Sequence, residues 1–301
     1  MSPTAETPLR ANLPPGPGVS RRSCLAAAGA ALLSVAARSA GAQRPTANRL
    51  AVGVEAALLA SGLADRLGAA LARDTGLVID WQGGPSGALL STLERGELAA
   101  ALVFEPQLER ALLAQNLVHD RRPVARTELV LIGPPPRRAG RRSTGGPAAG
   151  DPAGVVAGPR HDVQSALERI AAAGARGDAR FVASGEPSAI RALEREAWRP
   201  LAPPAVAPWW RTAGPGPAAA LELARASGAY ALVERGVWQA LGVVGSELAV
   251  LVEGDPRLAL DYHVMRAFRA PHPAGRLMVS WLAGPTGQQV VAAFARGYRP
   301  A

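Results

Sequence analysis

Short apolar runs alternate with amphipathic segments from residue 50 onwards. Apolar runs of strand length occupy residues 50–54, 77–81, 99–104 and 129–132. Between the first two runs, the apolar positions of residues 62–75 fall on one face of a helix, and shorter helices are predicted at 88–95 and 105–115. This alternation predicts an α/β fold with a largely parallel sheet covered by helices.

A second α/β series follows a Pro/Gly/Arg-rich segment at residues 134–154. Its predicted strands lie at 181–182, 229–233 and 248–252, with an extended segment at 262–266. Its predicted helices lie at 163–174, 188–198, 217–227, 235–241 and 284–296. Two such series without an internal repeat predict two lobes, and ligand pockets preferentially occur between lobes.

Residues 1–42 read as an export signal rather than as part of the fold. Arg21 and Arg22 precede an apolar run at 25–37, and Ala-Gly-Ala at 40–42 is typical of a cleavage site. The run is shorter than the roughly 20 residues that a membrane-spanning helix needs. The paired arginines resemble a twin-arginine signal, although Cys24 stands where a Phe is usual. We expect a periplasmic protein, with an uncleaved N-terminal anchor as the alternative.

Composition excludes several classes of function. Cys24 is the only cysteine, so a cleaved chain has no disulfide, thiol nucleophile or cysteine-ligated metal. The 4 histidines show no metal-ligand spacing. No nucleophile–base pair stands at recognisable spacing, so the chain is not expected to be an enzyme or to need a cofactor.

All 33 basic residues are arginine, and the formal net charge is +9. This bias reflects either codon usage or a preference for guanidinium groups, which suit oxyanions. With only 4% aromatic residues and no alternation of basic and aromatic positions, a nucleic-acid partner is not expected.

Two Gly/Pro-containing turns place a serine where a helix is predicted to begin. Ser86 stands in the turn at 83–87 and Ser188 in the turn at 185–188. Each serine either caps its helix or marks a helix start whose free N–H groups attract an anion. The sequence leaves both interpretations open.

Several segments resemble the solute-binding proteins of tungstate-type ABC transporters. VHDRRPV at 118–124 and ELVLIGP at 128–134 match that family's D-R-R-x-V-M-Y-N-D-F-V-L-V-G-P run, and LVEGDP at 251–256 continues the match. The resemblance implies a type II periplasmic-binding-protein fold, in which two α/β lobes with mixed sheets covered by helices are joined by a hinge. It implies lobe 1 at 43–128 and 255–301 and lobe 2 at 129–254. The expected partners of this monomer are a small anion and an ABC permease in the membrane.

The chain departs from the family where the ligand binds. Family members follow the first strand with T-T-T-S-T, whereas residues 55–60 read Glu-Ala-Ala-Leu-Leu-Ala and are interpreted as a turn. Glu55 adds a negative charge there, and only Ser61 and Gly62 remain. The contacts that the resemblance implies are Ser61, Gly62, Ser86, Gly87, Ser188 and Arg211.

We therefore expect an exported solute-binding protein that captures a tungstate- or molybdate-like oxyanion, or a divergent small ligand, between two closing lobes. The alternative is a sensory or protein-interaction protein on a binding-protein scaffold that has lost oxyanion binding.

Overall fold

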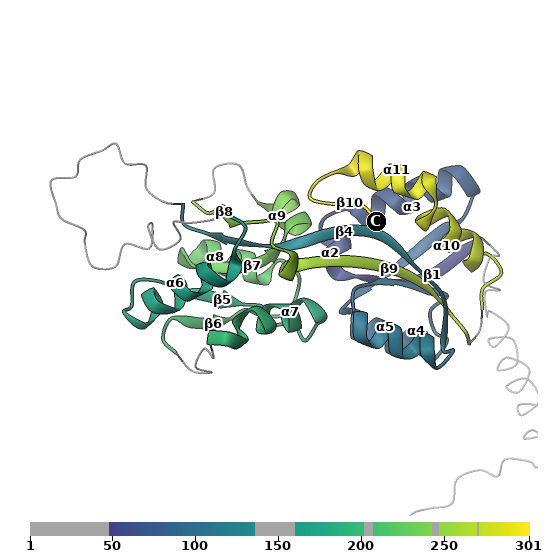
Figure 1. The fold of residues 1–301 in the computed structure, drawn as a ribbon. Helices are drawn as coiled ribbons and strands as arrows, with labels where there is room; N and C mark the ends of the chain where they lie inside the picture. Colours follow the sequence, from purple (N-terminus) through teal and green to yellow (C-terminus); the bar gives the residue numbers. More distant parts are fainter. Residues whose placement is uncertain (1–47, 136–159, 202–206, 243–246, 270) are drawn as a thin grey trace, which may run out of the picture. The chain divides into compact units, whose positions relative to one another are not determined.

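The computed structural model describes residues 48–135, 160–201, 207–242, 247–269 and 271–301. They form a ten-stranded mixed sheet whose main order is β2-β1-β3-β9-β4-β7-β5-β6, with β10 and β8 pairing with β4. Helices lie on both faces of this sheet (Figure 1). The predicted α/β class with a mixed sheet covered by helices is confirmed. The predicted export signal lies outside the described residues.

The first lobe is built around three parallel strands. β1 (Arg49–Glu55) lies between β2 (Val78–Gly84) and β3 (Ala100–Val103), and β9 (Ala259–Ala267) pairs with β3 antiparallel. In Figure 1, helices lie on both faces of these strands. They are α4 (Ser86–Glu94) and α5 (Pro106–Ala114) on one face, and α3 (Leu63–Thr75), α10 (Gly275–Ala283) and α11 (Pro285–Phe294) on the other.

The strand β4 (Val118–Gly133) passes from one lobe to the other. Its residues 118–128 pair with β9, and its residues 129–132 pair with β7 (Tyr230–Glu234). Near its end it also pairs with β8 (Ala249–Val252), and β10 (Arg299–Pro300) pairs with its first part. Register shifts against β9 between His119 and Arg122 and between Pro123 and Ala125 show that the long strand is irregular.

The second lobe repeats the parallel arrangement on a smaller scale. β5 (Phe181–Ala183) lies between β6 (Trp210–Thr212) and β7, parallel to both. Helices also pack around these strands (Figure 1). They are α6 (Val163–Ala175), α7 (Ala189–Trp198), α8 (Ala219–Ser227) and α9 (Arg235–Leu241).

Burial explains why the apolar runs became strands. Every residue of β3 and of β7 is buried, so apart from Glu234 at the end of β7 these strands read as continuous apolar segments rather than as alternating ones. In α3, Leu63, Leu67 and Leu71 are fully buried at helical spacing, and the helix ends at Gly76 with φ +73°. The buried side chains of these elements belong to the hydrophobic clusters that hold the strands in place.

Five features differ from the sequence prediction. Residues 56–60, interpreted as part of a turn, form the short helix α2 (Ala56–Ala60). α4 begins at Ser86 rather than at residue 88, and the first part of β4 is a strand although its sequence is polar. The helix α10 and the short strand β6 were not predicted.

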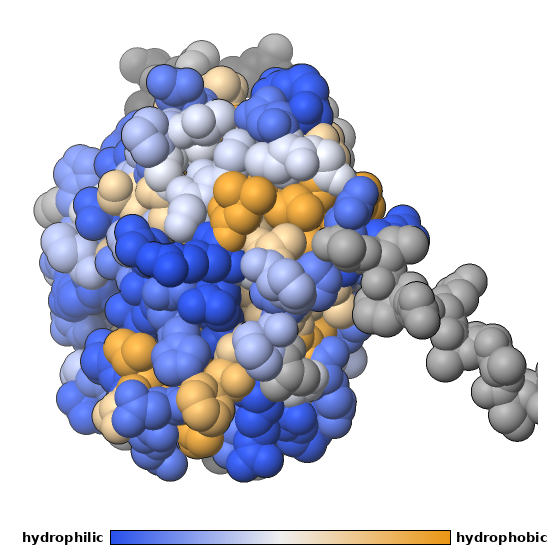
Figure 2. Space-filling model, turned by 90° about the vertical axis from the view of Figure 1, so that its right-hand side faces the viewer, coloured by the Kyte–Doolittle hydropathy of each residue, from blue (hydrophilic) through white to orange (hydrophobic). Residues whose placement is uncertain are grey.

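The surface at the end of the first lobe is mostly hydrophilic. Figure 2 shows small separate groups of hydrophobic side chains on this face. The exposed large hydrophobic residues of the first lobe stand on separate elements, among them Leu113 on α5 and Leu277 on α10. No helix in the described part of the chain is long and apolar enough to cross a membrane.

Candidate functional site

A small cavity lies where the carboxyl ends of β1, β5 and β7 meet. Glu55 ends β1, Ser184 follows β5 and Glu234 ends β7, and all three residues line the cavity. Ligands of open α/β sheets bind outside the carboxyl ends of the strands, which makes this cavity the candidate site. Its free volume is about 30 Å³, room for roughly two water molecules.

Glu55 reaches from the end of β1 to the first residue of α4. Its Oε2 accepts a hydrogen bond from the backbone N–H of Ser86 at 2.8 Å and a second one from the Ser86 hydroxyl. The Ser86 hydroxyl oxygen accepts the N–H of Phe104 at 2.9 Å. Glu55 is 2% exposed and Ser86 0%. The carboxyl group therefore satisfies donors at the start of α4 from inside the protein.

Glu234 is held by two tyrosines that come from the first lobe. The hydroxyl of Tyr262 donates to Oε2 at 2.6 Å, and the hydroxyl of Tyr298 donates to Oε1 at 2.5 Å. The Tyr298 hydroxyl also lies 2.9 Å from the Oγ of Ser61. Tyr298 fits because residue 236 is glycine, since a Cβ there would come within 2.3 Å of the ring. These contacts connect the two lobes beside the cavity.

Glu105, which follows β3, faces the start of α7. Burial and the charge of Glu109 raise the pKa of Glu105, and a hydrogen bond from the backbone of Ala189 opposes this shift. Glu105 also lies beside Gly87, where an added Cβ would be 4.0 Å from its Oε2. The first residues of both α4 and α7 therefore meet a carboxyl group of the chain itself.

The electrostatics of the cavity are those of an acidic site. Burial raises the pKa of Glu55 from 4.5 to about 8, and hydrogen bonds from Ser86 oppose the shift while Glu234 and Glu186 add to it. Burial also raises the pKa of Glu234, against the hydrogen bonds from the two tyrosines. The described residues that line the cavity include no basic side chain. Within the described ranges, no group of three or more His, Cys, Asp or Glu residues could hold a metal ion.

The predicted contact residues do not all gather at this cavity. Ser188 lines it and caps α7, with its hydroxyl accepting the N–H of Arg191 at 3.3 Å. Ser86 is the first residue of α4, whose cap is Pro85, so the N-cap interpretation of Ser86 is wrong. Gly87 follows it in the helix. Ser86 instead hydrogen-bonds with Glu55.

The other predicted contacts lie farther from the cavity. The Ser61 hydroxyl donates to the Leu58 carbonyl at 3.1 Å, and Gly62 precedes α3 with φ +84°. Arg211 stands on β6 and is exposed. Their role in ligand binding stays a prediction.

Sequence reasoning missed the acidic character of the site. Glu55 was recognised as an added charge, but Glu105 and Glu234 were not singled out. Each of these residues follows an apolar run directly, after Val54, Phe104 and Val233. An acidic residue at the carboxyl end of several predicted parallel strands was therefore a signal in the sequence for this site.

Gly185, in the loop that carries Glu186 and Ser188, tolerates no side chain. A Cβ at this position would lie 1.8 Å from the carbonyl oxygen of Ala213. We expect Gly185→Ala to lower the free energy of unfolding by about 1–3 kcal/mol because the backbone must shift. Gly214→Ala, in the facing loop, is the matched control, since no atom lies within 4 Å of a Cβ there. Urea unfolding measures both, and equal stability of the two variants would contradict the expectation.

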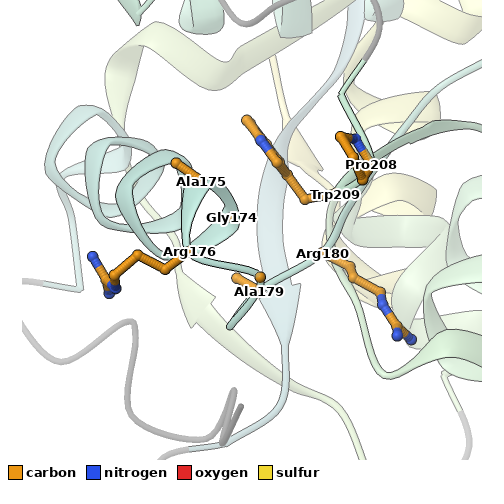
Figure 3. A pocket seen from close by; sticks show the side chains of 8 residues that line it. Gly174, Ala175, Arg176, Ala179, Arg180, Pro208 and Trp209 are labelled. Atoms are coloured by element: carbon orange, nitrogen blue, oxygen red, sulfur yellow. The ribbon is translucent and has the colours of Figure 1, made fainter. Parts of the chain in front are cut away.

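A second, larger groove lies on the second lobe away from these carboxyl groups. It has a volume of about 490 Å³ and lies between the end of α6 and the residues before β6. Figure 3 shows the side chains of Arg176 and Arg180 extending in opposite directions rather than towards one another. Arg176 pairs with Asp178 at 3.1 Å. The polar groups of this groove do not converge, so it is the weaker candidate.

The chain matches the sequence profile of the family described as bacterial extracellular solute-binding protein over residues 54–298. No curated protein matches the chain in a sequence comparison. The match begins at the end of β1 and includes all of the residues that form the cavity.

Several solved structures share the fold. The tungstate-binding protein TupA of Desulfovibrio alaskensis G20 is 24% identical with a TM-score of 0.66, covering 84% of this chain and 98% of that one. The tungstate ABC transporter structure of Geobacter sulfurreducens is 21% identical with a TM-score of 0.65, covering 81% and 98%. The periplasmic molybdate-binding protein of Azotobacter vinelandii is 13% identical with a TM-score of 0.55, covering 82% and 97%. At these sequence identities, the structural similarity shows a shared fold and no more.

Proposed function

The chain belongs to the bacterial extracellular solute-binding proteins, and from this premise we propose that it is the exported solute-binding component of an ABC transporter. It holds a small solute in the cavity between the two lobes and delivers it to a permease in the membrane. The observation that carries the proposal is the cavity itself, which the ends of β1, β5 and β7 form where the lobes meet. Similar structures named for tungstate and molybdate binding support the role of solute receptor.

In this proposal the lobes close on the solute by motion about two crossing segments. One segment is β4, and the other leads from Glu253 back to β9. Arg235 connects them, because it donates to Glu128 of β4 at 2.9 Å and to Glu253 at 2.5 Å. The described cavity has a free volume of only about 30 Å³, so in this proposal the lobes separate to admit the solute.

Export to the periplasm belongs to the same proposal. The paired arginines and apolar run of residues 1–42 support it, as does the family to which the chain belongs. The twin-arginine route is the one that Arg21 and Arg22 favour.

The test is whether the protein carries a solute in this cavity. We expect the purified protein to release a small molecule on denaturation that mass spectrometry identifies, and Ile190→Arg to abolish its retention. Ile190 lines the cavity and is half-buried, so a guanidinium group there fills the free volume. Ile79→Arg is the matched control, because Ile79 is also half-buried but lies on β2 beside a different surface hollow.

Two outcomes would contradict the proposal. One is equal retention of the solute by the two variants, which would place the solute elsewhere. The other is a protein that carries no solute and is not stabilised by any small molecule, since saturation at about 100 times the Kd adds roughly 2.7 kcal/mol to the stability of a receptor. The second outcome would favour a sensory or protein-interaction role on the same scaffold.

A further inference from the structure

The start of α4 has the features of an anion-binding site. The first N–H groups of a helix have no partner within the helix, and the helix dipole is positive there. Free anions commonly bind at such positions for this reason. At α4 the hydroxyl of Ser86 adds one more donor beside the backbone N–H of the same residue.

These donors are already taken by a carboxyl group of the protein. Glu55 and Gly84 are paired across the parallel strands β1 and β2, so Glu55 lies next to the turn that enters α4. Its Oε2 accepts both the N–H of Ser86, at 2.8 Å, and the Ser86 hydroxyl. Because both residues are buried, a second acceptor has no access to these donors while Glu55 stays in place.

The opposite helix start shows the same arrangement. α7 begins across the cavity with Ser188 as its cap, and the backbone of Ala189 hydrogen-bonds to Glu105 of the first lobe. Glu186 and Glu234 add further carboxyl groups to the cavity, and none of its described lining residues is basic. A tetrahedral oxyanion would therefore meet donors that are already occupied and further carboxyl groups of the protein, with no basic side chain among the described lining residues.

Resting on the proposed function, we propose that Glu55 is the specificity-determining residue of the cavity, a tethered carboxyl group that occupies the donors at the start of α4 and so excludes free oxyanions. The cavity is thereby left to small solutes, neutral or cationic, that donate hydrogen bonds to its carboxyl oxygens. Exclusion depends on occupancy rather than on charge alone, because a protonated carboxyl group keeps an oxygen that accepts from Ser86.

Titration calorimetry with sodium tungstate and sodium molybdate at pH 7 tests this proposal on four forms of the purified protein. Glu55→Ser removes the carboxyl group and restores a hydroxyl, whereas Glu55→Gln cannot ionise but keeps an amide oxygen on the Ser86 donors. Glu186→Ser is the matched control, because it removes a carboxyl group from the same cavity that has no hydrogen bond to Ser86. Glu55→Thr replaces Glu55→Ser if the latter does not unfold cooperatively in urea.

We expect Glu55→Ser to bind at least one of the two oxyanions at least tenfold more tightly than the wild type, Glu55→Gln and Glu186→Ser. Three results would overturn the proposal: a wild type that binds tungstate with micromolar affinity, a folded Glu55→Ser or Glu55→Thr protein without a tenfold gain, or an equal gain in Glu55→Gln. The last result would show that charge, not occupancy, excludes the anion.

The outcomes also separate this proposal from the proposed function. A wild type that carries a solute, together with a Glu55→Ser variant that gains nothing, would overturn the role of Glu55 and leave the receptor intact. A wild type without a solute, together with a Glu55→Ser variant that binds tungstate, would support the role of Glu55 and contradict a working receptor.

Discussion

The free energy of unfolding is expected to fall by several kcal/mol as the pH rises from about 5 to about 8. Burial raises the pKa of Glu55 and of Glu194 from 4.5 to about 8, and it raises those of Glu105 and Glu234 as well. Between the unfolded and folded pKa values, the folded protein binds more protons than the unfolded chain. Stability is therefore fully present below about pH 4.5 and is lost as the pH rises to about 8, by up to about 1.4 kcal/mol per pH unit for each group.

Other groups act in the opposite direction at lower pH. Burial lowers the pKa of His263, so its contribution is lost as the pH falls below 6.5. Hydrogen bonds from Ser165 and Arg257 lower the pKa of Asp162 to about 2, and its contribution is lost as the pH falls from 3.8 through that value. Because the raised carboxyl groups outnumber His263, the decline above pH 5 should dominate.

Urea unfolding at pH 5, 6.5 and 8 and constant ionic strength measures this dependence. Glu194→Gln is the informative variant, because its amide oxygen can still accept the Ser184 N–H that the carboxyl group accepts at 3.1 Å while it cannot ionise. Its stability should fall less steeply with pH than that of the wild type. If the stability of the wild type is constant or rises between pH 5 and 8, the raised pKa values of the buried glutamates would be refuted.

Arg235→Ala is expected to lower the free energy of unfolding by about 3 kcal/mol, the lower end of the range for removing one partner of a buried ion pair, because this network is only partly buried. Arg235 donates to Glu128 and Glu253, and the Glu128 carboxylate also accepts the N–H of Gly254 at 2.5 Å. Glu128 is only 8% exposed, so its charge would be left without a cationic partner. The substitution should weaken the contact between the two segments that cross between the lobes, because Arg235 hydrogen-bonds to both of them.

Arg126→Ala provides the control on the same strand. Arg126 pairs with Asp261 at 3.2 Å, but both side chains are more than half exposed, and such surface pairs contribute about 0–1 kcal/mol. Chemical denaturation at pH 7 compares the two variants. A loss below about 1 kcal/mol for Arg235→Ala would mean that its network does not hold the crossing segments together.

Much of the fold could be predicted because some of its strands are buried along their whole length and therefore have continuously apolar sequences. Runs such as 99–104 and 229–233 are apolar throughout, and the structure places β3 and β7 in the centre of the sheet. The first part of β4 could not be recognised in this way, because VHDRRPVARTE carries arginines and a proline. Its strand conformation depends on pairing with β9, which lies more than 130 residues away in the chain.

The site was less predictable than the fold. The resemblance to tungstate-binding proteins indicates ligand contacts from hydroxyl groups, whereas in the structure the donors at the start of α4 bind the carboxyl group of Glu55. The partners of Glu234 could not be inferred either, because Tyr262 and Tyr298 approach it from segments 28 and 64 residues away. Local patterns predict strands and helices, but such contacts arise only when the two lobes meet.

An experimental structure of the protein purified from cells, with whatever solute it retains, tests the central claim most directly. The account predicts electron density for a small molecule enclosed between the ends of β1 and β7, with the Glu55 carboxyl group on the donors of Ser86. Density for an oxyanion on Ser86, with Glu55 turned away, would contradict the account. So would a solute bound in the groove beside Trp209 while the cavity between the lobes stays closed.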